Sequence, residues 1–293
     1  MATREKMEEI LGLYLDYCNA KELSSVTINY YKRIVSHAIE GCNDIFDPMD
    51  LMKFFIHLNK EHSASPGYWN IFYRHLKAFY NFCERQGICE SNTLLKAGIN
   101  LKKVTRKMTV LSEESIQKLI ARFQNSPGSC RKRNLAIIAF LLETGVRPGE
   151  LCSVTLSNIN WDTNEIEVVG KTGERVVNIT AKTRRILQEY FKTERKYGSS
   201  YFFVDRLGKP MNTIKLRTLF NNLSRRNFGE RLYPYLFRHT FASAAIKNGV
   251  DLMSVSSMMG HKSITTTQIY LHPDKRHIKE AVERTSLVRQ LWK

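Results

Sequence analysis

The chain carries its most informative residues in two segments near its C-terminal end, YPYLFRHTFA at residues 233–242 and MMGHKSITTTQIY at residues 258–270. Together they contain an arginine beside a histidine, a second histidine after a glycine, and a tyrosine nine residues further on: Arg238, His239, His261 and Tyr270. A phenol can act as a nucleophile, a guanidinium donates two hydrogen bonds to one phosphate, and an imidazole moves a proton or hydrogen-bonds an oxygen. The residue types in these segments indicate chemistry on a phosphodiester.

Both segments are expected to be largely helical. Arg238 and His239 precede the apolar run FASAAI and are expected to open one helix, whereas His261 ends a helix that contains Val255 and Met259. The N-terminus of a helix attracts anions, so a phosphate bound by Arg238 would also be stabilised by the helix dipole.

Upstream, the sequence TGVRPGEL at residues 144–151 follows an apolar helix predicted over residues 135–142. Proline suits the first turn of a helix, so a short helix is expected to begin at Pro148. Arg147 would then lie in the turn between the two helices. A solvated arginine at a helix boundary is the alternative interpretation.

A β-hairpin is the next expected element. Residues 165–169 and 174–179 are rich in β-branched residues and flank the turn sequence GKTG. Residues 159–161 are a candidate for an earlier strand, and the pattern becomes helical again from residue 181. The hairpin would place Lys171 at its tip, where lysines are usually solvated. The predicted fold class is mainly α with a small antiparallel β-sheet.

Residues 1–100 are expected to form a separate bundle of four helices. Helical spacing of apolar residues marks residues 1–20, and Ser24 or Ser25 is expected to cap the second helix. Asp-Pro and Ser-Pro pairs at residues 47–48 and 65–66 are expected to open the third and fourth helices. The aromatic residues of the fourth helix recur at a spacing of three and four, which favours core packing over base stacking. The basic residues 101–107 are interpreted as a linker to a second domain, residues 108–293.

The formal net charge of the 293 residues is +17, and it is unevenly distributed. Residues 1–105 hold 13 Lys and Arg against 12 Asp and Glu, whereas residues 106–293 hold 32 against 16. This distribution favours a polyanion as the partner and predicts that the second domain binds it more strongly.

Several other classes of protein are disfavoured. No run approaches the roughly 18 apolar residues of a membrane span, and the charged N-terminal residues do not resemble a signal peptide. The six cysteines include no C-x-x-C pair, so reduced thiols are expected and a zinc site is not. A cytoplasmic, nucleoid-associated location is the corresponding expectation.

The order of these motifs resembles the C-terminal signature of the tyrosine recombinases, the Xer and phage-integrase family. There an Arg-His pair opens one helix, Gly-His closes the next, and the nucleophilic tyrosine follows nine residues later. TGVRPGEL likewise resembles the T-G-x-R-x-x-E-L box of the family, and VGKTGERVV resembles its hairpin. The resemblance implies a small helical N-terminal DNA-binding domain and a C-terminal catalytic domain, with no metal and no cofactor.

The resemblance also implies a role for each motif residue. Arg147 and Arg238 would bind the scissile phosphate, and His261 would hydrogen-bond it in the transition state. Tyr270 would attack the phosphodiester to give a 3′-phosphotyrosine, and Lys171 would protonate the leaving 5′ oxygen.

Three further positions would support this site. Glu150 would lie behind the phosphate arginines, and His239 would orient neighbouring groups. Tyr235 stands where the family usually has a histidine, three residues before Arg238. A hydrogen bond to a phosphate oxygen and a place in the core are both open for Tyr235, and the group that deprotonates Tyr270 is not assigned.

The implied activity is site-specific recombination of double-stranded DNA by four protomers on two sites, through a Holliday junction. An amphipathic helix expected over residues 277–292 would pack onto a neighbouring protomer. Resolution of chromosome dimers and integration of a mobile element both fit the residues. Two alternatives are a type IB topoisomerase that relaxes DNA as a monomer, and a non-catalytic DNA-binding protein on a decayed recombinase scaffold.

Overall fold

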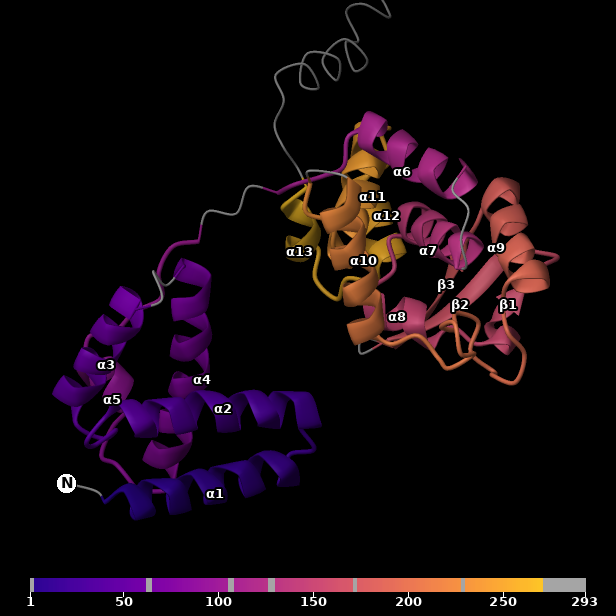
Figure 1. Cartoon of the computed structure of the whole chain (residues 1–293). Helices are drawn as coiled ribbons and strands as arrows, with labels where there is room; N and C mark the ends of the chain where they lie inside the picture. The colour runs from indigo at the N-terminus through magenta and orange to yellow at the C-terminus, as the bar shows by residue number, and fades with distance from the viewer. Residues whose placement is uncertain are drawn as a thin grey trace, which may run out of the picture. The chain divides into compact units, whose positions relative to one another are not determined.

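The structure, a computed structural model, describes residues 3–61, 65–104, 108–125, 130–170, 173–227 and 230–270. It divides the chain into two compact units, Met1–Arg106 and Lys107–Lys293 (Figure 1). The first is helical, and the second combines helices with a small antiparallel sheet, so the predicted fold class is confirmed.

The helices of the N-terminal unit begin where the sequence offers capping residues. Ser24 accepts a hydrogen bond from the N–H of Thr27 and Ser65 accepts one from Tyr68, as expected for N-cap serines. Asp47 caps the third helix in the same way through the N–H of Met49, at 2.6 Å. The helices are α1 (Arg4–Ala20), α2 (Ser25–Gly41), α3 (Pro48–Glu61), α4 (Pro66–Arg85) and the short α5 (Thr93–Lys96).

The aromatic residues of α4 form the core of this unit, which confirms their predicted packing role. Phe72, Phe79 and Tyr80 are fully buried, and the Tyr80 hydroxyl donates a hydrogen bond to the carbonyl of Ile45 at 2.6 Å. Because these rings lie against α1, α2 and α3, they do not form a base-stacking surface.

The chain beyond α5 returns along α4. The side-chain amide of Asn70 donates to the carbonyl of Lys102 at 2.8 Å, and its oxygen accepts from the N–H of Lys102 at 2.9 Å. The Lys102 ammonium also lies 3.8 Å from the ring centroid of Trp69. The first part of the predicted linker is therefore attached to the N-terminal unit, whereas residues 105–107 lie outside the described residues.

The C-terminal unit is built around the apolar helix α7. Residues on nearly all sides of α7 are buried, including Ile137, Phe140 and Leu141, because α6, α9 and α11 surround it. The helices are α6 (Glu113–Asn125), α7 (Arg131–Thr144), α8 (Pro148–Ser153), η1 (Leu156–Asn158), α9 (Ala181–Thr193), α10 (Thr213–Asn227), α11 (Pro234–Lys247), α12 (Leu252–Met259) and α13 (Thr265–Gln268).

The sheet has the strand order β1-β2-β3, and both pairings are antiparallel. The strands are β1 (Ile159–Asn160), β2 (Glu165–Gly170) and β3 (Gly173–Asn178), so the predicted hairpin and the candidate third strand are both present. Ile166 and Val168 of β2 are buried, while Glu167 and Val169, which alternate with them, are exposed, as expected for a half-buried strand.

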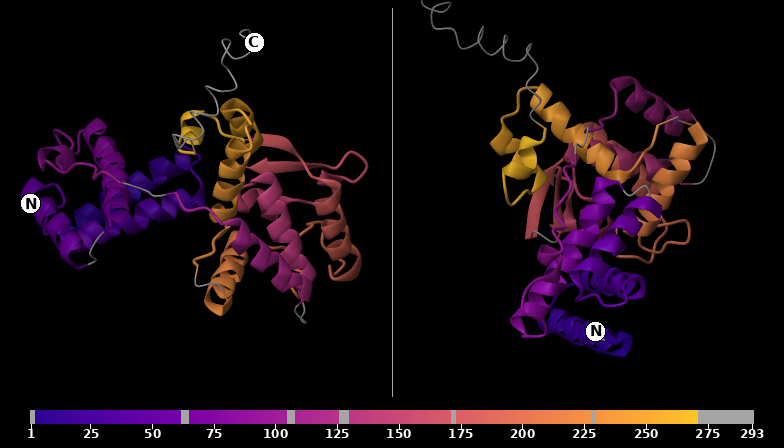
Figure 2. Two further views of the ribbon diagram at one scale, coloured as in Figure 1. Left: turned by 90° about the horizontal axis from the view of Figure 1, so that it is seen from above. Right: turned by 90° about the vertical axis from the view of Figure 1, so that its left-hand side faces the viewer.

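Helices α12 and α13, drawn in yellow, lie beside α11 in both views of Figure 2. A small hydrophobic cluster separate from the main core holds this region together, and it consists of Phe241, Ala242, Val255, Met259 and Tyr270. The cluster fixes the end of α12 and Tyr270, two residues after α13, against α11.

Candidate active site

Arg147 lies in the turn between α7 and α8, as predicted. Gly145 ends α7 in the left-handed conformation, with φ 58°, and a Cβ there would lie 2.3 Å from the Phe241 ring. The N–H of Arg147, the N-cap of α8, donates to Glu150 Oε2 at 2.8 Å, and its guanidinium Nη1 donates to Glu150 Oε1 at 2.8 Å. One carboxylate thus fixes both the backbone and the side chain of Arg147.

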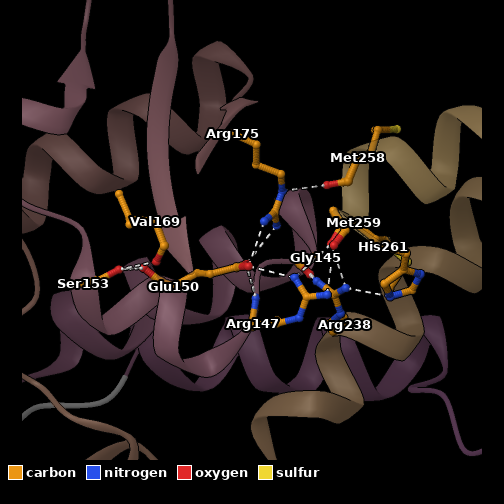
Figure 3. Close-up of polar contacts among 11 residues, drawn as sticks. Gly145, Arg147, Glu150, Ser153, Val169, Arg175, Arg238, Met258, Met259 and His261 are labelled. Atoms are coloured by element: carbon orange, nitrogen blue, oxygen red, sulfur yellow. Dashed lines mark hydrogen bonds and ion pairs between the residues drawn. The ribbon is translucent and has the colours of Figure 1, made fainter. Parts of the chain in front are cut away.

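Glu150 lies beneath the arginines with only 1% of its surface exposed. It also accepts two hydrogen bonds from Arg175, from Nη1 to Oε1 at 2.8 Å and from Nη2 to Oε2 at 2.9 Å (Figure 3). Burial alone would raise the pKa of Glu150, but the hydrogen bonds from Arg175 and Arg147 lower it to about 2. Glu150 is therefore an ionised carboxylate. Gly170 packs closely against it, because a Cβ at residue 170 would lie only 2.8 Å from Glu150 Oε1.

Arg175 on β3 is a site residue that the sequence analysis missed. Its Nε donates to the carbonyl of Met258 at 3.2 Å, so it links the hairpin both to Glu150 and to the end of α12. The sequence did contain a signal for this role. Side chains alternate between the two faces of β3, which places Arg175 on the same face as the buried Val177. An inward-facing arginine on a half-buried strand requires a partner such as Glu150.

Arg238 is a buried cation in the second turn of α11, with 3% of its surface exposed. The prediction that Arg238 and His239 open this helix is wrong, because Pro234 occupies the first helical position and begins the helix four residues earlier. The Arg238 guanidinium donates to the carbonyls of Gly145 and Met259 and to Nε2 of His261, the last at 2.8 Å. Burial and then the positive charge of Arg147 lower the pKa of Arg238 to about 10. Arg238 therefore remains charged at neutral pH, in surroundings that oppose its charge.

The end of α12 binds three arginines through successive carbonyls. Those of Met258 and Met259 accept from Arg175 and Arg238, and that of Gly260 accepts from Nη2 of Arg147 at 2.9 Å (Figure 3). The last carbonyls of a helix have no partner within the helix, so these guanidiniums satisfy groups that would otherwise be unpaired.

His261 follows this helix end, and its hydrogen bonds define its tautomer. A guanidinium can only donate, so Nε2 of His261 accepts from Arg238, and the ring hydrogen lies on Nδ1, 2.7 Å from the Thr267 hydroxyl oxygen. Burial and the charges of Arg238 and Arg147 lower the pKa of His261 to about 4. The ring is therefore neutral at physiological pH.

Tyr270 is buried, with 4% of its surface exposed, and its hydroxyl oxygen lies 2.8 Å from Nδ1 of His239. Burial raises the pKa of Tyr270, and the charge of Arg238 partly opposes this change. Burial and the same charge lower the pKa of His239. Tyr270 is therefore a neutral phenol beside a neutral imidazole.

The structure brings together most of the predicted site residues but separates one of them. Arg147, Glu150, Arg238 and His261 form one hydrogen-bonded network, with Tyr270 packed next to it through Met259. Lys171 lies outside the described residues, directly after the end of β2.

Tyr235 is the residue that stands apart. It is 48% exposed and makes no side-chain hydrogen bond with the described residues. A place for Tyr235 in the core, one of the two alternatives, is therefore wrong. Its position on the first turn of α11 points the ring to the surface, while Leu236 and Phe237 fill the core.

No group of three His, Cys, Asp or Glu side chains in the described segments could hold a metal ion. None of the helices described is both long and apolar enough to cross a membrane.

Comparison with known proteins identifies the class to which this fold and site belong. Residues 109–277 match the model of the phage integrase family, which covers more than half of the chain. The chain therefore belongs to the phage integrase family. It is a site-specific tyrosine recombinase, an enzyme that breaks and rejoins DNA.

Relatives match over nearly the whole chain. The tyrosine recombinase XerC of Pediococcus pentosaceus is 26% identical over 94% of this chain and 97% of its own length. The tyrosine recombinase XerA of Pyrococcus furiosus is 28% identical over 98% of both.

Solved structures share the fold. The Tn1549 transposon integrase in complex with circular intermediate DNA has a TM-score of 0.78 at 19% identity, over 94% of this chain and 99% of that one. The XerH recombinase bound to its difH substrate has a TM-score of 0.69 at 19% identity, over 96% of this chain and 84% of that one.

Proposed function

We propose that this recombinase cuts and rejoins duplex DNA through a 3′-phosphotyrosine formed by Tyr270. The observation that supports this most directly is the pairing of Arg147 and Arg238 on one helix end, where each raises the electrostatic energy of the other. An anion between two such cations relieves their repulsion and replaces the lost hydration of Arg238. A phosphodiester has the required charge, and its two non-bridging oxygens match two guanidiniums.

In this proposal the arginines hold the phosphate where charge develops during attack. Glu150 and the carbonyls of α12 fix them before substrate binds, so little reorganisation is needed in the transition state. His261 positions Arg238 in the described state. Donation from His261 to a phosphate oxygen would require the hydrogen on Nε2, and thus a change of tautomer as Arg238 turns toward the phosphate.

The proposed acid for the leaving 5′ oxygen is Lys171. The supporting observation is the anchoring of the residues on either side, since Gly170 packs on Glu150 and Arg175 binds the same carboxylate. Lys171 lies between these two residues in the sequence, so we expect it to approach the scissile phosphate from the hairpin side.

We propose double-stranded recombination-site DNA as the partner, bound by a DNA-binding N-terminal domain (1–100) and a catalytic domain (108–293), with four protomers on two sites. Among the similar structures, XerH is bound to a difH substrate and a lambda integrase dimer to a COC′ core site. The predicted protomer-contact helix, residues 277–292, lies outside the described residues. Such an enzyme would work at the nucleoid, either on chromosome dimers or on a mobile element.

The proposed function is tested in two steps. The DNA sequence that the chain protects from nuclease digestion is identified first, and a nicked suicide duplex that contains this sequence is then used as the substrate. The full chain should form a covalent adduct at the 3′ side of the cut and should join the cleaved strand to a second duplex. Adduct formation with relaxation of supercoils but without joining to a second duplex would support the topoisomerase alternative. A chain that binds the site without forming an adduct would contradict the proposal.

Replacement of Tyr235 by Phe tests the remaining role of this exposed residue. If its hydroxyl contacts a phosphate oxygen, Tyr235→Phe should slow single-turnover cleavage by less than the roughly 10²–10³-fold cost of a preorganised donor. The melting temperature should stay unchanged, because the side chain is 48% exposed. Wild-type rates at every pH would rule out a role at the phosphate. Tyr235→His should remain active.

The uneven charge predicts different salt dependences for the two units. Residues 106–293 carry a formal excess of 16 positive charges, against 1 for residues 1–105. Each phosphate contact releases counterions, so the isolated C-terminal unit should lose DNA affinity steeply as salt rises. The isolated N-terminal unit should bind far more weakly in the same titration, and equal affinities would contradict this division.

A further inference from the structure

The hydroxyl of Tyr270 has one described hydrogen-bond partner, the ring nitrogen Nδ1 of His239, at 2.8 Å. The two rings lie with centroids 5.6 Å apart and planes tilted by 46°. Tyr270 is held in this position by Phe241, Val255 and Met259. The contact is therefore part of a packed arrangement and involves the very oxygen that the proposed function uses as nucleophile.

His239 follows Arg238 on α11, and successive helical residues point about 100° apart. Arg238 accordingly faces the α12 carbonyls and His261, whereas His239 faces Tyr270. One helical turn thus holds a phosphate-binding cation and an imidazole at the nucleophile. Any movement of α11 would shift both together.

We propose that His239 is the base that accepts the proton of Tyr270 during DNA cleavage, an inference that rests on the proposed function. As the Tyr270 oxygen bonds to phosphorus, its proton moves to Nδ1 of His239. The phosphorus–5′-oxygen bond breaks, and its electron pair leaves with the 5′ oxygen, which takes a proton from the general acid, proposed to be Lys171. In rejoining, the 5′-hydroxyl attacks phosphorus and returns its proton to the amine proposed to be that of Lys171. The phosphorus–tyrosine bond breaks, and the imidazolium returns its proton to the tyrosine oxygen.

The other described candidates are less suitable for this step. Tyr235 stands at the position of the usual histidine, but a phenol is a poor base near pH 7, and this one is exposed at the surface. His261 uses Nε2 to accept from Arg238 and Nδ1 to donate to Thr267. His239 is thus the imidazole that touches the nucleophile.

The charge state of His239 suits a base at neutral pH. The groups that act on its ring are Arg238 from α11 itself and Tyr270 from the segment after α13, while Ala245, Ile246 and Val250 around the cluster are apolar. Burial and Arg238 hold the pKa of His239 below its usual value of about 6.5, so the free base prevails above that pH. Cleavage should therefore rise with pH up to the His239 pKa and level off above it.

The test uses the full chain and a suicide duplex, with single-turnover cleavage measured between about pH 5 and pH 8. His239→Asn places an amide near the position of Nδ1, so it can keep the hydrogen bond but cannot take the proton. We expect this variant to cleave about 10²–10⁴-fold more slowly and to lose the rise with pH. His261→Gln is the matched control, because it removes the other imidazole of the site and should be slower but keep the rise.

A second variant separates proton transfer from positioning. His239→Ala opens space beside Tyr270, and added free imidazole should restore cleavage in proportion to its unprotonated fraction. Wild-type rate and pH profile in His239→Asn would overturn the inference, as would a folded His239→Ala that imidazole does not rescue. If neither variant folds, a wild-type cleavage rate that falls as the pH rises from about 5 to about 7 would overturn it. Absence of any adduct in the wild type would instead contradict the proposed function.

Discussion

Tyr270→Phe should abolish the covalent protein–DNA adduct while leaving the fold intact. The substitution removes one oxygen and keeps the ring in its cluster with Phe241, Val255 and Met259. The lost hydrogen bond to His239 should cost only about 0.5–1.5 kcal/mol of unfolding free energy. Gel separation of adducts on a nicked suicide duplex, with melting temperature and DNA affinity measured alongside, provides the readout.

Tyr233→Phe is a suitable control for this experiment. Tyr233 is the N-cap residue of α11, the helix that carries His239, and it packs against the main core, so its hydroxyl is not expected to react. The control should form adducts at the wild-type rate. An adduct that persists in Tyr270→Phe would place the nucleophile elsewhere in the chain.

Glu150→Ala should have the largest effect on stability, because it leaves two partly buried guanidiniums without their shared carboxylate. Arg147 and Arg175 have side chains 24% and 14% exposed, and Glu150 is 1% exposed. Removing one partner of a buried ion pair typically costs about 3–5 kcal/mol. Chemical denaturation should show this loss, and adduct formation should fall steeply as Arg147 loses its position.

Glu189→Ala is the matched comparison, since the exposed Glu189 forms a surface pair with Lys132 in the same unit. Such a pair contributes at most about 1 kcal/mol, so this variant should unfold near the wild-type denaturant concentration. If both variants lost the same free energy of unfolding, the Glu150 network would contribute no more to stability than a surface ion pair.

Glu150 should also determine part of the loss of folding stability at acid pH. The folded-state pKa of Glu150 is about 2, below the usual value of about 4.3, so its contribution to stability is present above that usual value. It is lost as the pH falls toward 2. Wild type should therefore lose stability over this range more steeply than Glu150→Ala, and parallel curves would contradict the assignment.

Local rules predicted much of this fold from the sequence. The helix starts after Ser24 and Ser65, the hairpin around residues 170–173 and the turn at Arg147 each depend on neighbouring residues. The four-residue helix α5 was not predicted, because it contains one turn and no repeated apolar pattern.

The contacts of the site were harder to predict. His239 and Tyr270 are 31 residues apart, and Arg175 reaches Glu150 across 25, so both contacts depend on packing that spacing alone does not reveal. The motifs predicted four of the residues in the hydrogen-bonded network, Arg147, Glu150, Arg238 and His261, whereas Arg175, the tautomer of His261 and the burial of each side chain required the structure. The two alternatives for Tyr235 were left open for the same reason, because an aromatic residue beside Leu236 and Phe237 is compatible with either face of α11.

The end of α12 has a consequence for the charge that the site offers to DNA. Arg147, Arg175 and Arg238 carry three positive charges, Glu150 removes one, and a helix C-terminus contributes roughly half a negative charge. About one and a half positive charges therefore remain. A bound phosphodiester carries one negative charge, and a second develops as the tyrosine oxygen attacks. The residual charge exceeds that of the resting phosphate, so positive charge remains unneutralised when the substrate is bound. The additional negative charge that develops during attack is attracted to it, which stabilises the reacting state.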